Sequence, residues 1–462
     1  MPLPLDWDHP RGETIDIFVR RLPAAQPSGR QAWLLAGGPG GSGLDMLKPA
    51  LTLHREDPTV DVYLPDHRGT GQSHIFGCPN SVPLGDRPDA LSFWAPCIDA
   101  LEAKWGAGLA QLTTTNAAHD LGALIGRTRR AHDEVHVLGI SYGTIWAQRY
   151  LQFFPRQATS VTLDGLVHTP PSDIFGSDTL FDKIARELMQ GCGTDPFCAG
   201  KLGPHPEDRL RALHEALDAG TCAPLAQAGV TRKDMRNAFA TLLSAARLRV
   251  LIPAVTYRAL RCGPADVEAV KKIALRFRWQ PSDAPWSEDG FADALYMHII
   301  LSEISAPTPP SLEELQRAQA ATFASADEST LLRKLYDIWP RYPHDRHVAE
   351  YPDTRVPMLL LNGTLDPQTR IEDARQIAGH YTRPNQTFIS VPNAGHPVMS
   401  TSYIAGNDRM TCGEQMWISF MKDPRAPIDP SCMGHLRGFA FEGTPQLAKQ
   451  FLGTADLWEN TP

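Results

Sequence analysis

The sequence predicts an α/β protein with a mostly parallel sheet, helices on both faces of the sheet and an inserted helical cap domain. Short apolar segments alternate with longer segments of helical periodicity as far as residue 164. Strand patterns then disappear between about residues 176 and 325, and they return at 358–361 and 386–391. Strands that alternate with helices favour a parallel sheet, because each crossover helix packs against one of its faces. We therefore expect one α/β core that a helical insertion interrupts.

The individual elements follow from their periodicity and from the residues that end them. Residues 14–20 alternate in polarity, as a half-buried strand does, whereas the other strand candidates are short apolar runs. The predicted strands are 14–20, 32–36, 61–65, 135–138, 160–164, 358–361 and 386–391. The predicted helices are 116–131, 145–154, 177–190, 206–218, 231–247, 250–260, 264–278, 288–304, 311–323 and 412–421. We expect the first part of the core at 1–170, the cap domain at 171–350, and the second part with a cysteine-containing segment at 351–462.

Composition and charge limit the class of partner. The chain is 42% hydrophobic and 21% charged, with a formal net charge of −8. This composition is typical of globular proteins, and the negative charge argues against nucleic acid or an anionic membrane surface as a partner. No apolar run is long enough to span a membrane. We expect a peptide or small-molecule substrate, and the sequence leaves the oligomeric state open.

The eight cysteines bear on the cellular compartment. They lie in neighbouring pairs along the chain, and none has the close spacing of a zinc site. Eight cysteines can pair in about a hundred ways, so the sequence does not fix the connectivity. Two pairs would close short loops rich in Gly, Pro and Asp, which favours an oxidised, secreted or periplasmic protein. A cytoplasmic protein with scattered thiols is the alternative, because the N-terminus lacks the pattern of a signal peptide.

The strongest chemical signal is the segment Gly139-Ile-Ser141-Tyr-Gly143. It follows a predicted strand and precedes a predicted helix, which is the setting of a nucleophile elbow. The turn is tight, so the positions two before and two after the serine must be small. We therefore expect Ser141 to be a nucleophile with an exposed hydroxyl; an ordinary turn between a strand and a helix is the alternative.

A serine hydroxyl needs a general base, and that base needs an orienting acid. Asp366 follows the strand 358–361, and His396 follows the strand 386–391, in the chain order Ser, acid, His that accompanies such an elbow. We expect Asp366 to orient His396 and His396 to be the base. The competing acids are Asp164, Glu372 and Asp373.

A glycine cluster, Gly37-Gly-Pro-Gly-Gly-Ser-Gly43, follows the strand 32–36. Acyl transfer builds an oxyanion that needs preorganised N–H donors, and we expect these donors to be the backbone of Gly38 and of Tyr142. A phosphate-binding loop is disfavoured because no Gly-Lys-Ser/Thr follows. Asp66 and Arg68, beyond the strand 61–65, are candidates for bracing this region, although a simple turn explains them equally well.

Together these motifs resemble the prolyl-aminopeptidase and tripeptidyl-aminopeptidase family of α/β-hydrolases. The resemblance rests on GGPGGSG, DHRGTGQS, GISYG, NGTLDP and NAGH, and covers most of residues 3–170 and 355–435. The segment between Cys192 and Cys198 looks like a cysteine pair of the tripeptidyl type. The sequence departs from the family at Ala36, where the first motif usually begins with His.

The resemblance implies a serine exopeptidase that releases residues from a free peptide N-terminus through an acyl-enzyme. The family binds the substrate ammonium group with a carboxylate from the cap, and the stretch 295–304 is similar to that segment, which makes Glu303 the candidate. The mechanism needs no cofactor and no metal. A carboxylesterase or amidase with the same triad is the first rival, and a non-catalytic binding protein is the second.

Overall fold

The computed structural model describes residues 1–168, 174–278 and 290–459. The chain forms two compact units. Unit 1 comprises Met1–Ile174, Pro281–Pro309 and Leu332–Arg437, and unit 2 comprises Phe175–Gln280, Pro310–Leu331 and Gly438–Pro462. Each unit is therefore assembled from segments that lie far apart in the sequence.

Unit 1 contains a seven-stranded sheet in the order β3-β5-β4-β6-β7-β8-β9. The pair β3 and β5 is antiparallel, and all the other neighbouring strands are parallel, as the sequence predicts. The strands are β3 Val19–Leu22, β4 Arg30–Leu35, β5 Val60–Pro65, β6 Glu134–Ile140, β7 Ser160–Asp164, β8 Met358–Gly363 and β9 Gln386–Val391. Every residue of β7 and β8 is buried, which agrees with their place inside a covered sheet.

The strand expected at 14–20 is divided in the structure. Residues Thr14–Asp16 form β2, which pairs with β1 (Pro2–Pro4) in a separate two-stranded sheet, whereas β3 begins at Val19. The backbone N–H of Phe18 donates to Ser73 Oγ (2.7 Å), and its carbonyl accepts from the N–H of Asp66. The chain therefore leaves one sheet and enters the other at residues 17–18, and polarity alternation cannot reveal this change of partner.

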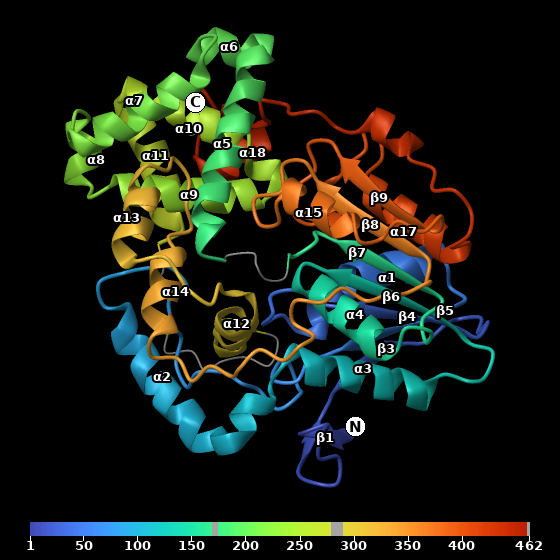
Figure 1. The fold of residues 1–462 in the computed structure, drawn as a ribbon. Helices are drawn as coiled ribbons and strands as arrows, with labels where there is room; N and C mark the ends of the chain where they lie inside the picture. The colour runs from blue at the N-terminus through green and yellow to red at the C-terminus, as the bar shows by residue number, and fades with distance from the viewer. Residues whose placement is uncertain (169–173, 279–289, 460–462) are drawn as a thin grey trace. The chain divides into compact units, whose positions relative to one another are not determined.

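Helices cover both faces of the sheet in unit 1 (Figure 1). Helices α1 (Leu47–Glu56) and α17 (Cys412–Lys422) pack on one face and share a core with β4, β5, β6 and β8. On the other face, α3 (Thr114–Thr128) packs against α4 (Tyr142–Phe153), and α4 contacts β6 and β7. Burial of these apolar faces is the main force that holds the unit together.

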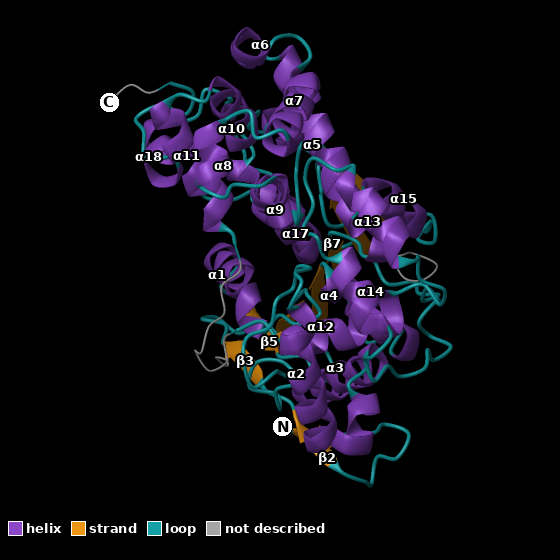
Figure 2. Ribbon diagram, turned by 90° about the vertical axis from the view of Figure 1, so that its left-hand side faces the viewer, coloured by secondary structure: helices purple, strands orange, loops and turns teal. Residues whose placement is uncertain are grey.

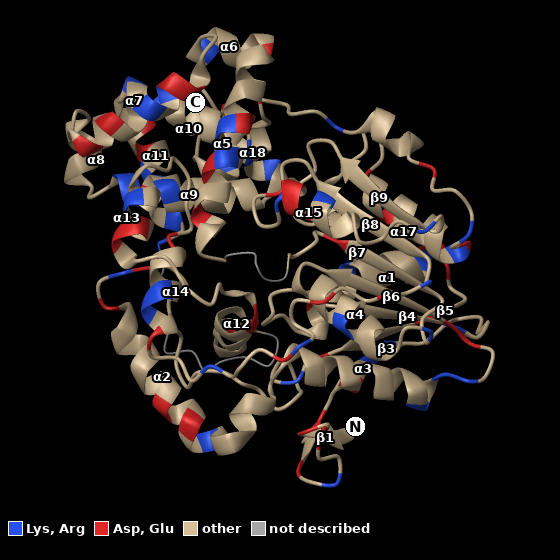
Figure 3. Ribbon diagram, viewed as in Figure 1, with Lys and Arg blue, Asp and Glu red and all other residues tan. Residues whose placement is uncertain are grey.

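The described part of unit 2 is helical and contains no strand (Figure 2). Its helices are α5 Ser177–Thr194, α6 Pro196–Leu202, α7 Pro206–Asp218, α8 Ala223–Gln227, α9 Arg232–Ser244, α10 Leu251–Arg261, α11 Pro264–Arg276, α13 Leu312–Ala320 and α18 Pro445–Phe451. Lys and Arg are interspersed with Asp and Glu along these helices (Figure 3). The charges thus form ion pairs such as that of Arg258 with Asp266, whose oxygen lies 3.1 Å from the guanidinium.

The compact units join segments that are distant in the sequence, and the domains expected at 1–170, 171–350 and 351–462 stay a prediction. Residues 281–309 belong to unit 1, where the N–H of Ala292 donates to the carbonyl of Gly40 (2.9 Å). Residues 438–462 belong to unit 2, where the guanidinium of Arg258 donates to the carbonyl of Leu457 (2.6 Å). Such contacts between distant segments have no local signal in the sequence.

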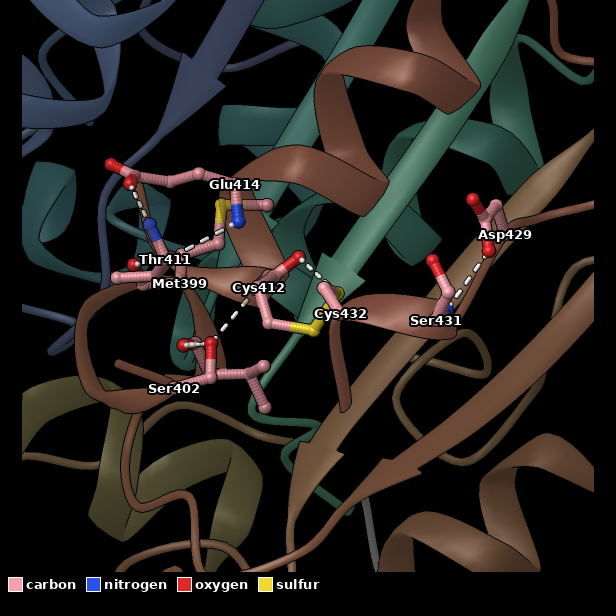
Figure 4. The surroundings of a disulfide bond; sticks show 10 residues. Met399, Ser402, Thr411, Cys412, Glu414, Asp429, Ser431 and Cys432 are labelled. Carbon is pink, nitrogen blue, oxygen red and sulfur yellow. Dashed lines mark hydrogen bonds between the residues drawn. A yellow bond between two sulfur atoms is a disulfide. The ribbon is translucent and has the colours of Figure 1, made fainter. Parts of the chain in front are cut away.

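The cysteines form four disulfides between neighbours in the chain. The pairs are Cys78–Cys97, Cys192–Cys198, Cys222–Cys262 and Cys412–Cys432, and no free cysteine is present. The last pair ties the start of α17 to the 3-10 helix Ser431–His435, and the N–H of Cys412 donates to the carbonyl of Ser402 (2.9 Å) beside it (Figure 4). Disulfides of this number are typical of proteins outside the cytoplasm. Within the described residues, no helix has the length and apolar character to cross a membrane.

Candidate active site

Ser141 lies in a sharp turn between β6 and α4, with backbone angles φ 57° and ψ −127°. A left-handed φ is costly for a residue with a side chain and persists only where the surroundings impose it. The flanking glycines show why the turn has this sequence. A Cβ on Gly139 would lie 2.2 Å from the carbonyl oxygen of Gly143, and a Cβ on Gly143 would lie 2.4 Å from that of Leu35. The structure therefore has the tight elbow that the sequence predicts.

His396 and Asp366 form a hydrogen-bonded pair. The Nδ1 atom of His396 lies 2.8 Å from Asp366 Oδ2 and must donate, because the carboxylate only accepts. Asp366 is buried and also accepts from the N–H groups of Gln368 (2.8 Å) and Thr369 (2.9 Å) and from Thr369 Oγ1 (2.6 Å). These bonds fix the ring of His396, and because Nδ1 carries the proton, Nε2 is the basic nitrogen of the neutral ring.

Burial and charge act in opposite directions on this pair. Burial raises the pKa of Asp366, but His396 and the hydrogen bonds from Thr369 outweigh it, so the pKa lies below its usual value. Burial lowers the pKa of His396, but the carboxylate of Asp366 outweighs it and the pKa is raised. Asp366 is therefore an anion at neutral pH, and His396 is a stronger base than an isolated imidazole.

The ends of neighbouring strands bring Ser141 and His396 to the same edge of the sheet. The N–H of Ser141 donates to the carbonyl of Asp164 (2.9 Å), so the elbow is bonded to the end of β7. The next residue, Gly165, lies directly against the ring of His396, because a Cβ there would be 2.6 Å from His396 Cε1. The carboxyl ends of β6, β7, β8 and β9 thus carry all three residues of the expected triad.

Asp164, the main competitor for the acid, has a different place. Its two carboxylate oxygens accept from the N–H groups of Val398 (2.9 Å) and Met399 (2.8 Å), at the start of α16 (Val398–Thr401). Burial raises the pKa of Asp164 to about 7. Asp164 therefore holds the segment that follows His396, whereas Asp366 contacts the imidazole itself.

The glycine cluster lies against the nucleophile. A Cβ on Gly37 would be 2.9 Å from Ser141 Cβ, which places the loop beside the elbow. Gly38 has φ +117°, a conformation that side chains rarely adopt. Asp66 braces the same loop, because its Oδ1 atom accepts from the N–H of Gly43 (2.7 Å). The loop that we expect to supply an oxyanion donor is thus held in contact with Ser141.

A cavity of about 220 Å³ adjoins this loop within unit 1. Three of its lining residues, Gly37, Ile140 and Pro397, are the chain neighbours of Gly38, Ser141 and His396. The remaining lining residues are Asp45, Met46, Lys48, Pro49, Met399, Ser400 and Glu414. The cavity therefore adjoins the glycine loop, the elbow and the segment that follows His396.

The side chain of Tyr142 is buried and fully hydrogen-bonded. Its hydroxyl lies 3.0 Å from His67 Nε2 and 2.8 Å from Thr114 Oγ1. Sequence reasoning singled out the Asp66-His-Arg68 motif but assigned no role to His67, and it had no signal for Thr114. Arg68 lies in the same motif and makes two bonds to Asp120 (2.7 and 2.8 Å), which lies on α3.

Glu303 lies in unit 1 and is buried among polar partners. Its Oε1 atom accepts from the N–H of Thr114 (2.8 Å) and the hydroxyl of Tyr342 (2.7 Å), and Oε2 lies 3.7 Å from the guanidinium of Arg149. Glu303 belongs to a π-helical turn, Ile300–Ile304, that extends α12 (Asp293–Ile299). Such turns are rare in proteins overall, but those that occur are frequently found at functional sites. The structure thus supplies Glu303 with a cation of its own.

Parts of this chain are similar to known proteins. Residues 328–432, which contain Asp366 and His396, match the family of TAP-like proteins. The chain has an α/β-hydrolase fold, and this segment is similar to TAP-like proteins. It is 28% identical over 249 residues to the serine protease Hip1 of Mycobacterium tuberculosis, a match that covers 47% of this chain and 45% of the relative. It is 28% identical over 211 residues to a tripeptidyl aminopeptidase of Streptomyces lividans, which covers 40% of this chain and 38% of the relative. The matched part of this α/β-hydrolase thus spans less than half the length of either relative.

Solved structures related to this α/β-hydrolase have low sequence identity. A proline iminopeptidase of Mycobacterium smegmatis is 14% identical with a TM-score of 0.38, and the match covers 92% of this chain and 98% of that one. An esterase of Exiguobacterium antarcticum is 13% identical with a TM-score of 0.36, with 89% and 97% covered.

Proposed function

We propose that this α/β-hydrolase is a serine exopeptidase that releases N-terminal residues from peptides through an acyl-enzyme. The observation that carries the proposal is the bond of His396 Nδ1 to the buried Asp366, at the sheet edge where Ser141 occupies a strained elbow. Relatives named as a serine protease and a tripeptidyl aminopeptidase support peptides as the substrate class. The four disulfides support action in the periplasm or outside the cell.

In the proposed mechanism, Ser141 attacks the scissile carbonyl while His396 Nε2 takes its proton. The imidazolium that forms is stabilised by Asp366. The N–H groups of Gly38 and Tyr142 bind the oxyanion, and His396 then protonates the leaving amine. Water attacks the acyl-enzyme by the same steps in reverse and regenerates Ser141.

The expected role of Glu303 as the anchor for the substrate ammonium stays a prediction. A buried carboxylate needs a cation, and the structure provides Arg149 at 3.7 Å. This pairing favours a second candidate function, a carboxylesterase or amidase whose substrate carries no ammonium group. The two functions differ in the substrate and share the same triad.

Three chromogenic substrates separate the two candidates: an alanyl or prolyl anilide with a free amine, the same anilide with a blocked amine, and a short-chain nitrophenyl ester. The exopeptidase requires turnover of the free-amine anilide and little turnover of its blocked twin. Turnover of the ester with neither anilide cleaved would contradict the exopeptidase and establish the esterase. The Ser141→Ala variant is the blank for all three.

A further inference from the structure

A buried series of hydrogen bonds passes through the hydroxyl of Tyr142, the residue that follows Ser141. Glu303 Oε1 accepts from the N–H of Thr114 (2.8 Å), Thr114 Oγ1 bonds the Tyr142 hydroxyl (2.8 Å), and that hydroxyl bonds His67 Nε2 (3.0 Å). None of these four residues is more than 3% exposed. These hydrogen bonds connect the loop after β5, the first turn of α3, the first turn of α4 and the π-helical turn.

The direction of each bond in this series is fixed. His67 Nδ1 lies 2.7 Å from the carbonyl of Arg68 and must therefore donate. Burial lowers the pKa of His67 to about 3, so the ring is neutral and its Nε2 atom accepts. The hydroxyl of Tyr142 then donates to His67 and accepts from Thr114. Each polar group thus has one defined role, and loss of one member leaves its neighbours unpaired in a buried place.

We propose that these hydrogen bonds position the oxyanion donor, which is the backbone N–H of Tyr142. The phenol of Tyr142 is the positioning group, and His67, Thr114 and Glu303 support it. Tyr142 is the first residue of α4, and its backbone N–H is one of the two oxyanion donors in the proposed mechanism. An oxyanion donor acts through preorganised geometry, and a residue whose side chain is held at two points cannot rotate its backbone freely. The proposal rests on the serine-hydrolase chemistry of the proposed function, but it does not depend on peptides as substrates.

These hydrogen bonds also give the buried carboxylate of Glu303 a structural role. Thr114 is the first residue of α3, where backbone N–H groups have no partner within the helix. The carboxylate of Glu303 accepts from one of these groups at the positive end of the helix dipole. Glu303 therefore supports Tyr142 through Thr114, whatever group the substrate presents.

The test measures the rate at which a fluorophosphonate probe labels Ser141 in the full chain, because the phosphoryl oxygen of the probe occupies the oxyanion hole. Tyr142→Phe removes only the hydroxyl and is expected to slow labelling about tenfold, a part of the loss seen when an oxyanion donor is removed. The matched control is Tyr381→Phe, since the buried Tyr381 hydroxyl bonds Gln148 (2.7 Å) outside this series. The control is expected to lower the melting temperature without changing the labelling rate.

Two further variants of Thr114 separate positioning from stability. Thr114→Ser keeps the hydroxyl and is expected to label at nearly the wild-type rate, whereas Thr114→Val should match Tyr142→Phe. Equal labelling of Tyr142→Phe and Tyr381→Phe, or no difference between the Ser and Val variants, would overturn the proposal. A wrong assignment of exopeptidase activity would give a different result: Ser141 would be labelled normally, but the free-amine anilide would not be cleaved.

Discussion

Two buried aspartates near His396 have different tasks, and their hydrogen bonds separate them. Asp366 contacts the imidazole and has a lowered pKa, so it is an anion throughout the neutral range. Asp164 accepts from the backbone N–H groups of Val398 and Met399, beyond the histidine, and burial raises its pKa to about 7. In the proposed mechanism, Asp366 is therefore the group that stabilises the imidazolium of His396.

The raised pKa of His396 predicts the pH dependence of activity. His396 acts as a base only when neutral, so kcat/KM should fall as the pH falls through a pKa that lies above the usual histidine value of about 6.5. Asp366→Asn removes the charge that raises this pKa, so the acid limb should move to lower pH, with kcat reduced by roughly 10⁴-fold. A pH profile of both proteins checks this. An acid limb at the same pH in both would show that Asp366 does not set the basicity of His396.

The glycine loop Gly37–Gly43 contains the second residue whose substitution tests the proposed mechanism. Gly38 has φ +117°, and a Cβ there would lie 2.1 Å from the N atom of Gly40. Gly38→Ala must therefore move the loop, and we expect kcat to fall by about 10²-fold with KM changed less. Gly200→Ala is the control, because a Cβ there would meet no atom within 4 Å. Steady-state kinetics measure this change. A wild-type kcat in the Gly38→Ala variant would show that this loop does not contribute to the oxyanion hole.

At the scale of elements, local patterns predicted most strands and helices of the core. The elbow at Ser141 and the loops of Asp366 and His396 were predictable because each follows a strand and carries a short motif. The division of 14–20 into two strands and the π-helical turn at Glu303 were not, because both depend on partners distant in the sequence. The pairing of Glu303 with Arg149 has the same origin, since 154 residues separate the two in the chain.

Helix α16 gives the prediction at this scale. Asp164 accepts from two N–H groups at its start, directly after His396. Asp164→Ala would leave both groups buried without a partner, at a cost of about 1–3 kcal/mol each, and would release the segment that carries the base. We expect a lower melting temperature and at least tenfold lower kcat. Calorimetry and kinetics on one preparation check this, and a destabilised variant with full activity would show that α16 does not position His396.

At the scale of the whole molecule, disulfides stabilise both compact units. Cys78–Cys97 and Cys412–Cys432 lie in unit 1, and Cys192–Cys198 and Cys222–Cys262 lie in unit 2. A disulfide constrains the unfolded chain more when it closes a longer loop. The contribution of each bond should therefore follow its sequence separation.

The two disulfides of unit 2 provide a direct comparison. Cys222 and Cys262 are 40 residues apart, and Cys192 and Cys198 are 6 apart. Replacing each pair with serines should lower the free energy of unfolding by about 4 and about 2 kcal/mol, respectively. Denaturant titration of the two variants checks the order. A larger loss for the short loop would show that native contacts, and not loop closure, dominate the stabilisation.

Ser141 is the proposed nucleophile of a triad with His396 and Asp366. Labelling the intact protein with a fluorophosphonate and mapping the modified peptide by mass spectrometry tests this assignment. We predict a single modified residue, Ser141, with labelling abolished in Ser141→Ala and strongly reduced in His396→Ala. Modification of another serine, or labelling of Ser141 at the same rate without His396, would show that Ser141 is not activated by this triad.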